Sequence, residues 1–198
     1  MPRRWRPEMA KLTPTPSQTV GPFFALGLTW LDTVDLAAGA AAGERIVITG
    51  RVLDADGAPI PDAMLEVWQA DAHGRYAHAE DTQDKPKDKV FAGFGRIATN
   101  KDGVFRFTTI KPGAVPGPGN SLQAPHIVVA LFMRGMLRHL YTRIYFSDEA
   151  GANDADPVLA LIEEARRATL VATRADGAAE YRWDIAMRGD AETVFFDC

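Results

Sequence analysis

The sequence predicts an all-β protein, an antiparallel β-sandwich with one short helix and an extended N-terminal arm. Short runs of alternating or β-branched residues recur along the 198-residue chain between turn dipeptides, a pattern typical of sandwiches. Helix signals gather in one segment only, and prolines crowd the start of the chain, where they exclude a regular element. We therefore expect an arm over residues 1–25 and a single domain over residues 26–198.

The expected strands follow one another along the chain, and turns bound them. The runs are 45–53, 63–69, 94–99, 104–110, 126–133, 138–146, 169–173 and 181–187. Asp102-Gly103 and Asp176-Gly177 each separate two runs and predict hairpins, and the Arg134-Gly135 turn separates another pair. Residues 126–133 are apolar on both faces, which predicts a central strand of the sandwich.

The expected helix follows a clear start signal. Asp156 stands where an N-cap belongs, and Pro157 suits the first helical position. Residues 158–167 (VLALIEEARR) then continue the helical pattern. Residues 80–89 are instead polar and dense in charge, so they predict a surface loop.

Composition and charge exclude several classes of protein. Hydrophobic residues make up 46% of the chain, as in an ordinary globular domain, and the net charge of -4 argues against a protein that coats nucleic acid. The longest apolar run lies near residues 127–133, too short to span a membrane. A single cysteine, Cys198, excludes an intrachain disulfide and a thiolate metal cluster. The arginines at positions 3, 4 and 6 precede no apolar segment, so we expect a cytoplasmic protein without a signal peptide.

Two side chains stand out as candidates for chemistry. His126 follows Pro125 and opens the most apolar strand, so it is either a core histidine with a hydrogen-bond partner or a metal ligand. Tyr76 follows a His73-Gly74 turn, and alone it reads as a surface or interface tyrosine. Together, a phenolate and an imidazole suit a hard ferric ion, although a full site needs about four protein ligands.

One face of the expected strand 138–146 is also a candidate surface. By the two-residue period of a strand, His139, Tyr141, Arg143 and Tyr145 share that face. The face either lines a pocket or meets a partner subunit, and the pattern favours the partner.

Several longer motifs resemble the intradiol ring-cleaving dioxygenases. They are residues 15–24 (TPSQTVGPFF), 50–76 (GRVLDADGAPIPDAMLEVWQADAHGRY), 94–113 (FGRIATNKDGVFRFTTIKPG), 124–135 (APHIVVALFMRG) and 140–149 (LYTRIYFSDE). The resemblance covers nearly the whole chain, and the motifs come in the family's order. It implies a β-sandwich fold and a ferric iron held by two tyrosines and two histidines.

The resemblance also shows where this chain departs from the family's ligand pattern. Tyr76 matches the first ligand tyrosine, but Val115 stands where the second is expected. His126 matches the first ligand histidine, and Val128 replaces the second. Gln123 replaces an arginine that precedes the histidines in iron-binding members. Because valine has no lone pair to donate, we expect no metal here and regard Tyr76 and His126 as vestigial ligand positions.

The chain resembles most closely the smaller, alpha type of chain in the heteromeric members of this family. That resemblance implies a hetero-oligomer of αβ pairs, with Fe(III) held by a larger beta subunit and with O2 and a small aromatic carboxylate as substrates. It further implies that Thr19 and Pro22 border the substrate pocket and that Arg134 reaches the substrate carboxylate. Phe23 departs from the tyrosine expected at its position. Neither nucleic acid nor a membrane is an expected partner.

Two other interpretations remain open at this stage. A stand-alone transthyretin-like binding module would share the strand count and turn chemistry, but it would give residues 15–24 no purpose. An enzyme with a different metal, held by His126, His139 and Tyr141, is the other alternative.

Overall fold

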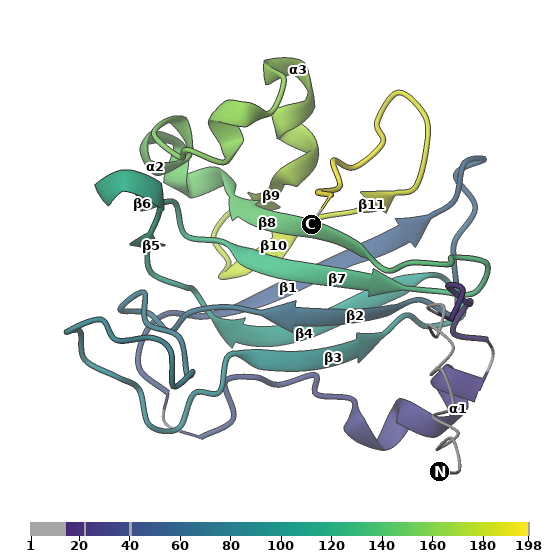
Figure 1. Ribbon diagram of the computed structural model, residues 1–198, viewed down its shortest axis with the longest axis horizontal. Helices are drawn as coiled ribbons and strands as arrows, with labels where there is room; N and C mark the ends of the chain where they lie inside the picture. Colours follow the sequence, from purple (N-terminus) through teal and green to yellow (C-terminus); the bar gives the residue numbers. More distant parts are fainter. Residues whose placement is uncertain (1–14, 22, 40, 198) are drawn as a thin grey trace, which may run out of the picture.

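The computed structural model describes residues 15–21, 23–39 and 41–197, and the strands form two facing layers (Figure 1). One layer contains β4, β1, β10 and β9, with β11 at the edge of β1, and the other contains β8, β7, β2 and β3. The parallel pair β8–β9 joins the layers into one curled nine-stranded sheet. The strands are β1 (Arg45–Leu53), β2 (Met64–Trp68), β3 (Phe94–Ala98), β4 (Val104–Ile110), β5 (Val115–Pro116), β6 (Leu122–Gln123), β7 (Ile127–Phe132), β8 (Leu140–Phe146), β9 (Val171–Arg174), β10 (Glu180–Arg182) and β11 (Ile185–Ala186).

The core lies between the two layers and follows the alternation in the sequence. Each long strand turns every second side chain inward, so that apolar residues of both layers interdigitate. The inward set includes Ile46, Ile48, Leu65, Val67, Ile97, Phe105, Phe107, Ile127, Val129, Leu131, Ile144 and Phe146. The predicted sandwich class is therefore confirmed. The sheet is mixed rather than purely antiparallel, because β1 runs parallel to β10 and β11 and β8 runs parallel to β9.

The turns agree with the sequence in two cases and differ in a third. The Arg134-Gly135 turn joins the antiparallel pair β7–β8, and Asp176-Gly177 joins the hairpin β9–β10. Asp102-Gly103 also forms a tight turn, closed by a hydrogen bond from the Gly103 N–H to the Asn100 carbonyl. However, β3 pairs with β2 and β4 pairs with β1, so this turn crosses between layers and the predicted hairpin is wrong.

Helical structure is shorter and more divided than predicted. The helices are α1 (Phe23–Leu28), α2 (Ala150–Asp154) and α3 (Glu164–Arg167), with 3-10 turns η1 (Thr29–Leu31), η2 (Pro118–Asn120), η3 (Ser147–Glu149), η4 (Leu159–Leu161) and η5 (Ala168–Leu170). Asp156 does cap the expected segment, since its Oδ1 accepts hydrogen bonds of 2.8 Å from the N–H groups of Val158 and Leu159. Ile162 is extended, with ψ 137°, and splits the segment into η4 and α3. In the described part of the chain, no helix has the length and apolar character needed to cross a membrane.

The start of the chain has two parts. Residues 15–21 form neither helix nor strand, and residues 15–20 are exposed. Helix α1 begins at Phe23, inside the segment expected to be extended. Residues 1–14 and Pro22 lie outside the described residues.

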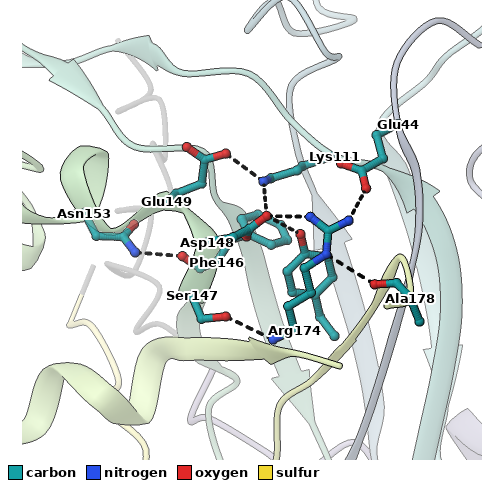
Figure 2. A network of polar contacts seen from close by, with 10 residues as sticks. Glu44, Lys111, Phe146, Ser147, Asp148, Glu149, Asn153, Arg174 and Ala178 are labelled. Carbon is teal, nitrogen blue, oxygen red and sulfur yellow. Dashed lines mark hydrogen bonds and ion pairs between the residues drawn. The ribbon is translucent and has the colours of Figure 1, made fainter. Parts of the chain in front are cut away.

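A polar network connects both edges of the β4–β1–β10–β9 layer to the 3-10 turn η3, which follows β8 (Figure 2). One oxygen of Asp148, Oδ2, accepts hydrogen bonds from Lys111 Nζ (2.8 Å), Arg174 Nη1 (2.7 Å) and the Tyr181 hydroxyl (2.9 Å). Arg174 Nη2 also donates to Glu44 at 2.6 Å. Partial burial opposes ionisation of Asp148, but the three hydrogen bonds outweigh it and lower its pKa to about 2.

The first prediction concerns the stability that Asp148 provides. At pH 7 the Asp148→Asn substitution should lower the free energy of unfolding by about 1–2 kcal/mol, a range reduced for solvent screening of this partly exposed carboxylate. Because the folded pKa lies below the unfolded value near 3.9, the contribution exists above pH 4 and is lost as the pH falls towards 2.

Urea unfolding of the full chain at pH 7 and pH 3 measures both effects. Asp102→Asn is the control, because Asp102 makes only a 3.7 Å ion pair with exposed Lys101. A difference between wild type and Asp148→Asn that does not shrink at pH 3 would contradict the proposed ionic origin.

Candidate functional site

Tyr76 is positioned by a tight turn whose conformation the sequence dictates. The Asp71 carboxylate is buried, and its Oδ1 accepts a 3.0 Å hydrogen bond from the Arg75 N–H. Gly74 has a φ of +75°, a left-handed conformation that favours glycine. The chain leaving this turn places the Tyr76 ring parallel to Trp68 of β2, with ring centroids 5.8 Å apart. The phenol is thus held over the outer face of the β8–β7–β2–β3 layer.

The surroundings of Tyr76 keep its phenol protonated. Burial raises the pKa of Tyr76; the Arg143 charge opposes that rise and the Asp81 charge adds to it. Asp81 is itself fixed by the loop, because its Oδ2 accepts a 2.7 Å hydrogen bond from the Tyr76 N–H. In the part of the chain that the structure describes, the Tyr76 hydroxyl has no hydrogen-bond partner. It is a free donor at neutral pH.

His126 is the buried histidine that the sequence left open between two roles. It is 3% exposed, and its Nδ1 lies 2.8 Å from the Ala124 carbonyl, so the proton must be on Nδ1. Its ring packs against Tyr145 of β8 at 5.7 Å. Burial and the nearby Arg143 charge lower the pKa of His126 to about 4, so the imidazole is neutral at pH 7. His126 therefore has the satisfied hydrogen bond of a core histidine.

Strand register places Arg143 in the same region of the sheet as Tyr76 and His126. Trp68 of β2, Val128 of β7 and Arg143 of β8 stand directly opposite one another in the sheet. Directly paired residues present their side chains on the same face, so all three lie in one row on the outer face. The resemblance described above matches Val128 to the family's second ligand histidine. The Arg143 side chain stands directly beside Val128 in this row.

The contacts of Arg143 are to neutral acceptors. Its Nη1 donates to Gln123 Oε1 at 2.7 Å and to the Tyr145 hydroxyl at 3.2 Å. The Tyr145 hydroxyl in turn donates to buried Asp156 Oδ1 at 3.3 Å. No carboxylate among the described residues forms an ion pair with Arg143. The guanidinium also lies over the Phe196 ring, 5.8 Å from its centroid, and its charge acts to lower the pKa of both Tyr76 and His126.

Of the side chains described above, Trp68, Tyr76 and Gln123 border an open cavity of about 640 Å³, whereas His126 and Arg143 are not among its lining residues. Its lining residues are Trp68, Tyr76, His78, Glu80, Asp81, Thr82, Gln83, Val115, Pro116 and Gln123. The donor set does not suit ferric iron: Val115 and Val128 offer no lone pair, and Arg143 adds a repelling charge. Within the described ranges, no group of three or more His, Cys, Asp or Glu side chains is arranged to hold a metal ion.

Three of the four side chains predicted to share a face (Tyr141, Arg143 and Tyr145) lie on β8, and His139 just precedes the strand. The four line two separate places. Arg143 and Tyr145 adjoin His126 and Gln123, as described above. His139 and Tyr141 pack edge to face, 4.7 Å between ring centroids, and line a different cavity of about 480 Å³. Tyr141 lies four residues, or about 13 Å, along the strand from Tyr145. The structure therefore does not bring His126 to His139 and Tyr141, and the alternative metal site has no geometric support.

Two of the residues predicted to bind substrate meet near the other end of the β7–β8 pair. The Gly135 N–H donates to Thr19 Oγ1 at 3.0 Å, which attaches the arm to the Arg134-Gly135 turn. The Arg134 side chain is 57% exposed, and its Nε pairs with Asp62. The third predicted residue, Pro22, lies outside the described residues. Since β7 spans six residues, about 20 Å separates this turn from the start of the strand at Ile127, next to His126.

Comparison with known proteins shows that the chain is similar to ring-cleaving dioxygenases along most of its length. A family model described as "Dioxygenase" matches residues 20–189. The protocatechuate 3,4-dioxygenase alpha chain of Burkholderia cepacia is 46% identical over 96% of this chain and 100% of its own length. The beta chain of that enzyme from the same organism is 41% identical over 76% of this chain and 67% of its own. A solved dioxygenase domain from Streptomyces sp. SirexAA-E superposes with a TM-score of 0.59 and 26% identity, over 92% of this chain and all of that one.

The second prediction concerns iron at the Tyr76 cavity. The full chain purified alone should be colourless and should contain no stoichiometric iron, because two donors are missing. The double substitution Val115→Tyr and Val128→His restores donor types but leaves Arg143, so it should remain iron-poor. Adding Arg143→Gln should then raise iron content and give phenolate-to-iron absorption.

Elemental analysis and visible absorption spectra measure these outcomes. Arg106→Gln in the same double variant is the control, because it removes an exposed guanidinium on β4 of the other layer. Stoichiometric ferric iron and colour in the unmodified isolated chain would contradict the assignment of Tyr76 and His126 as vestigial.

Proposed function

This chain belongs to the intradiol dioxygenase family, and we propose that it is the iron-free alpha subunit of a protocatechuate 3,4-dioxygenase. The observation that carries the proposal is the state of the Tyr76 site, which keeps the family's framework with two of its four ligands replaced by valine. A chain of this kind contributes to catalysis through the residues that it places at the interface with an iron-binding partner.

The partner is a larger beta subunit that holds Fe(III). The assembled enzyme inserts both atoms of O2 into 3,4-dihydroxybenzoate and cleaves the ring between the two hydroxylated carbons, which yields 3-carboxy-cis,cis-muconate. The iron on the partner supplies the oxygen chemistry. This chain supplies a wall of the substrate pocket and the interface that positions it, in a hetero-oligomer of αβ pairs located in the cytoplasm.

Arg134 acts as the clamp for the substrate carboxylate. Asp62 engages its Nε, and no acceptor within the described part of the chain engages Nη1 or Nη2. These two terminal nitrogens can donate a pair of parallel hydrogen bonds to a carboxylate, a geometry that a lysine cannot provide. The hydrogen bond between Gly135 and Thr19 fixes the turn that carries Arg134. Thr19 and Pro22 border the same pocket from the arm.

Exposed apolar side chains on the arm, on α1 and η1, and after the Arg134-Gly135 turn support a subunit interface. Val20 of the arm is 42% exposed, Leu26 of α1 74%, Trp30 of η1 77% and Leu137 beyond the Arg134-Gly135 turn 63%. Obligate subunit interfaces commonly bury more than about 2,000 Å² in total and are rich in such residues. A self-contained transthyretin-like module would leave both the arm and these side chains without a role.

The third prediction tests the Arg134 clamp. Arg134→Ala, reconstituted with the wild-type partner, should lower kcat/KM for 3,4-dihydroxybenzoate by about 2–3 kcal/mol, roughly 30- to 150-fold. Most of the loss should appear in KM, because the carboxylate is remote from the bond that breaks.

Steady-state kinetics with catechol, which has no carboxylate, is the substrate control and should show a far smaller loss. Arg138→Ala is the matched variant, because Arg138 is an exposed arginine nearby. Equal losses for the two substrates would assign Arg134 to the interface or the fold instead.

The fourth prediction tests the arm. Deletion of residues 1–21 should leave the sandwich folded, because residues 15–20 are exposed and contribute nothing to the core. Turnover of the reconstituted enzyme should fall, because the deletion removes Thr19 from the Arg134-Gly135 turn. Far-ultraviolet circular dichroism and kcat measure the two effects, with Thr19→Val as the point variant. Full turnover after the deletion would show that the arm does not border the pocket.

A further inference from the structure

Asp62 and Arg134 face each other just beyond the end of the β2–β7 pair. In the antiparallel register of these strands, Met64 pairs with Phe132. Continued for two more residues, the same register sets Asp62 opposite Arg134, and directly opposed residues present their side chains on one face. Their ion pair, in which Asp62 Oδ2 accepts from Arg134 Nε, therefore follows from the pairing of the two strands.

Buried hydrogen bonds fix the segment that carries Asp62. The hydroxyl of Thr99, a residue 7% exposed, donates to the Ile60 carbonyl at 2.8 Å and accepts from the Ala63 N–H at 3.0 Å. The Thr99 N–H also donates to the Ala63 carbonyl at 2.9 Å. Ala63 is itself 2% exposed. Asp62 thus projects from a backbone that is held on both sides of it.

Arg134 is the longer and more exposed partner of the pair. Its side chain is 57% exposed, against 19% for that of Asp62. Ordering a long side chain when a ligand binds typically costs about 2- to 12-fold in affinity. An exposed ion pair contributes little to the stability of a fold. The main effect of this pair is therefore on the position of the guanidinium, which the fixed carboxylate holds in place before substrate arrives.

The nitrogen that Asp62 engages decides which edge of the guanidinium remains. A guanidinium can offer a carboxylate either the edge formed by Nε and one terminal nitrogen or the edge formed by both terminal nitrogens. Asp62 takes the first edge through Nε. Nη1 and Nη2 have no acceptor in the described part of the chain, so the second edge can donate two parallel hydrogen bonds to another carboxylate.

We propose that Asp62 is a positioning residue of the substrate site, which holds Arg134 by Nε and presents the Nη1–Nη2 edge to the substrate carboxylate. The hydrogen bond from the Gly135 N–H to Thr19 holds the main chain of the same turn, so that main chain and side chain have separate anchors. This role rests on the proposed function of Arg134 and adds the residue that orients it. The negative charge of Asp62 also repels an anionic substrate, so its test must separate orientation from charge.

Two neutral substitutions make that separation. Asp62→Asn keeps an oxygen that can accept from Nε, whereas Asp62→Ala removes it, and both lose the same negative charge. In the complex reconstituted with the wild-type partner, KM for 3,4-dihydroxybenzoate should be about 2- to 12-fold higher for Asp62→Ala than for Asp62→Asn. The two kcat values should agree within about 2-fold, because the carboxylate is remote from the bond that breaks. KM for catechol, which has no carboxylate, should be the same for both variants.

A double-mutant cycle assigns the effect to Arg134. In the Arg134→Ala background, the difference between Asp62→Asn and Asp62→Ala should disappear. Asp56→Asn and Asp56→Ala are the matched controls and should both behave like the wild type, because Asp56 is exposed in the Asp56-Gly57 turn. If circular dichroism shows that Asp62→Ala does not fold, Asp62→Ser takes its place, since serine is neutral and too short to reach Nε.

The outcomes distinguish this proposal from the proposed function. Equal KM values for Asp62→Asn and Asp62→Ala, in a complex where Arg134→Ala shows its carboxylate-specific loss, would overturn the role of Asp62 and leave the Arg134 clamp standing. A difference that persists without Arg134, or that affects catechol equally, would assign Asp62 to the fold or the interface and would also overturn it. Equal losses of Arg134→Ala on both substrates would refute the clamp itself, and the role of Asp62 with it.

Discussion

The register of β7 against its two neighbours decides both what the core contains and what the outer face presents. Pairing of Ile127 with Ile144 directs an apolar set into the space between layers, and the same pairing places Val128 between Trp68 and Arg143 on the other side. A slip of one residue would exchange the two sets. The core therefore constrains the outer face, because Val128 and Arg143 stay side by side as long as the sandwich stays packed.

The sequence predicted much of this arrangement, and its failures have physical causes. Alternation identifies the strands and inward residues, and the motifs identify Tyr76, His126 and the two valines. Neither reveals that β3 and β4 pair with different partners, because a tight turn at Asp102-Gly103 is compatible with a hairpin and with a crossing between layers. The extended Ile162 was missed because capping by Asp156 describes the start of a helix and not its continuation.

The role of Arg143 shows the same limit at the site. The two-residue period placed it correctly on a face with Tyr145, but only cross-strand pairing shows that it stands beside Val128. Likewise, the prediction that Thr19 and Arg134 work together came from resemblance, and their contact through Gly135 joins segments more than a hundred residues apart. Contacts of this kind depend on tertiary structure, and no local pattern encodes them.

The mixed sheet also has a consequence for biosynthesis. β1 is among the first strands to leave the ribosome, yet β10 and β11, its parallel neighbours, come from the last twenty residues of the chain. One edge of β1 thus stays unpaired until residues 180–186 have been made, and an unpaired edge invites association with other chains. Nascent chains would therefore need protection from one another until those residues have emerged.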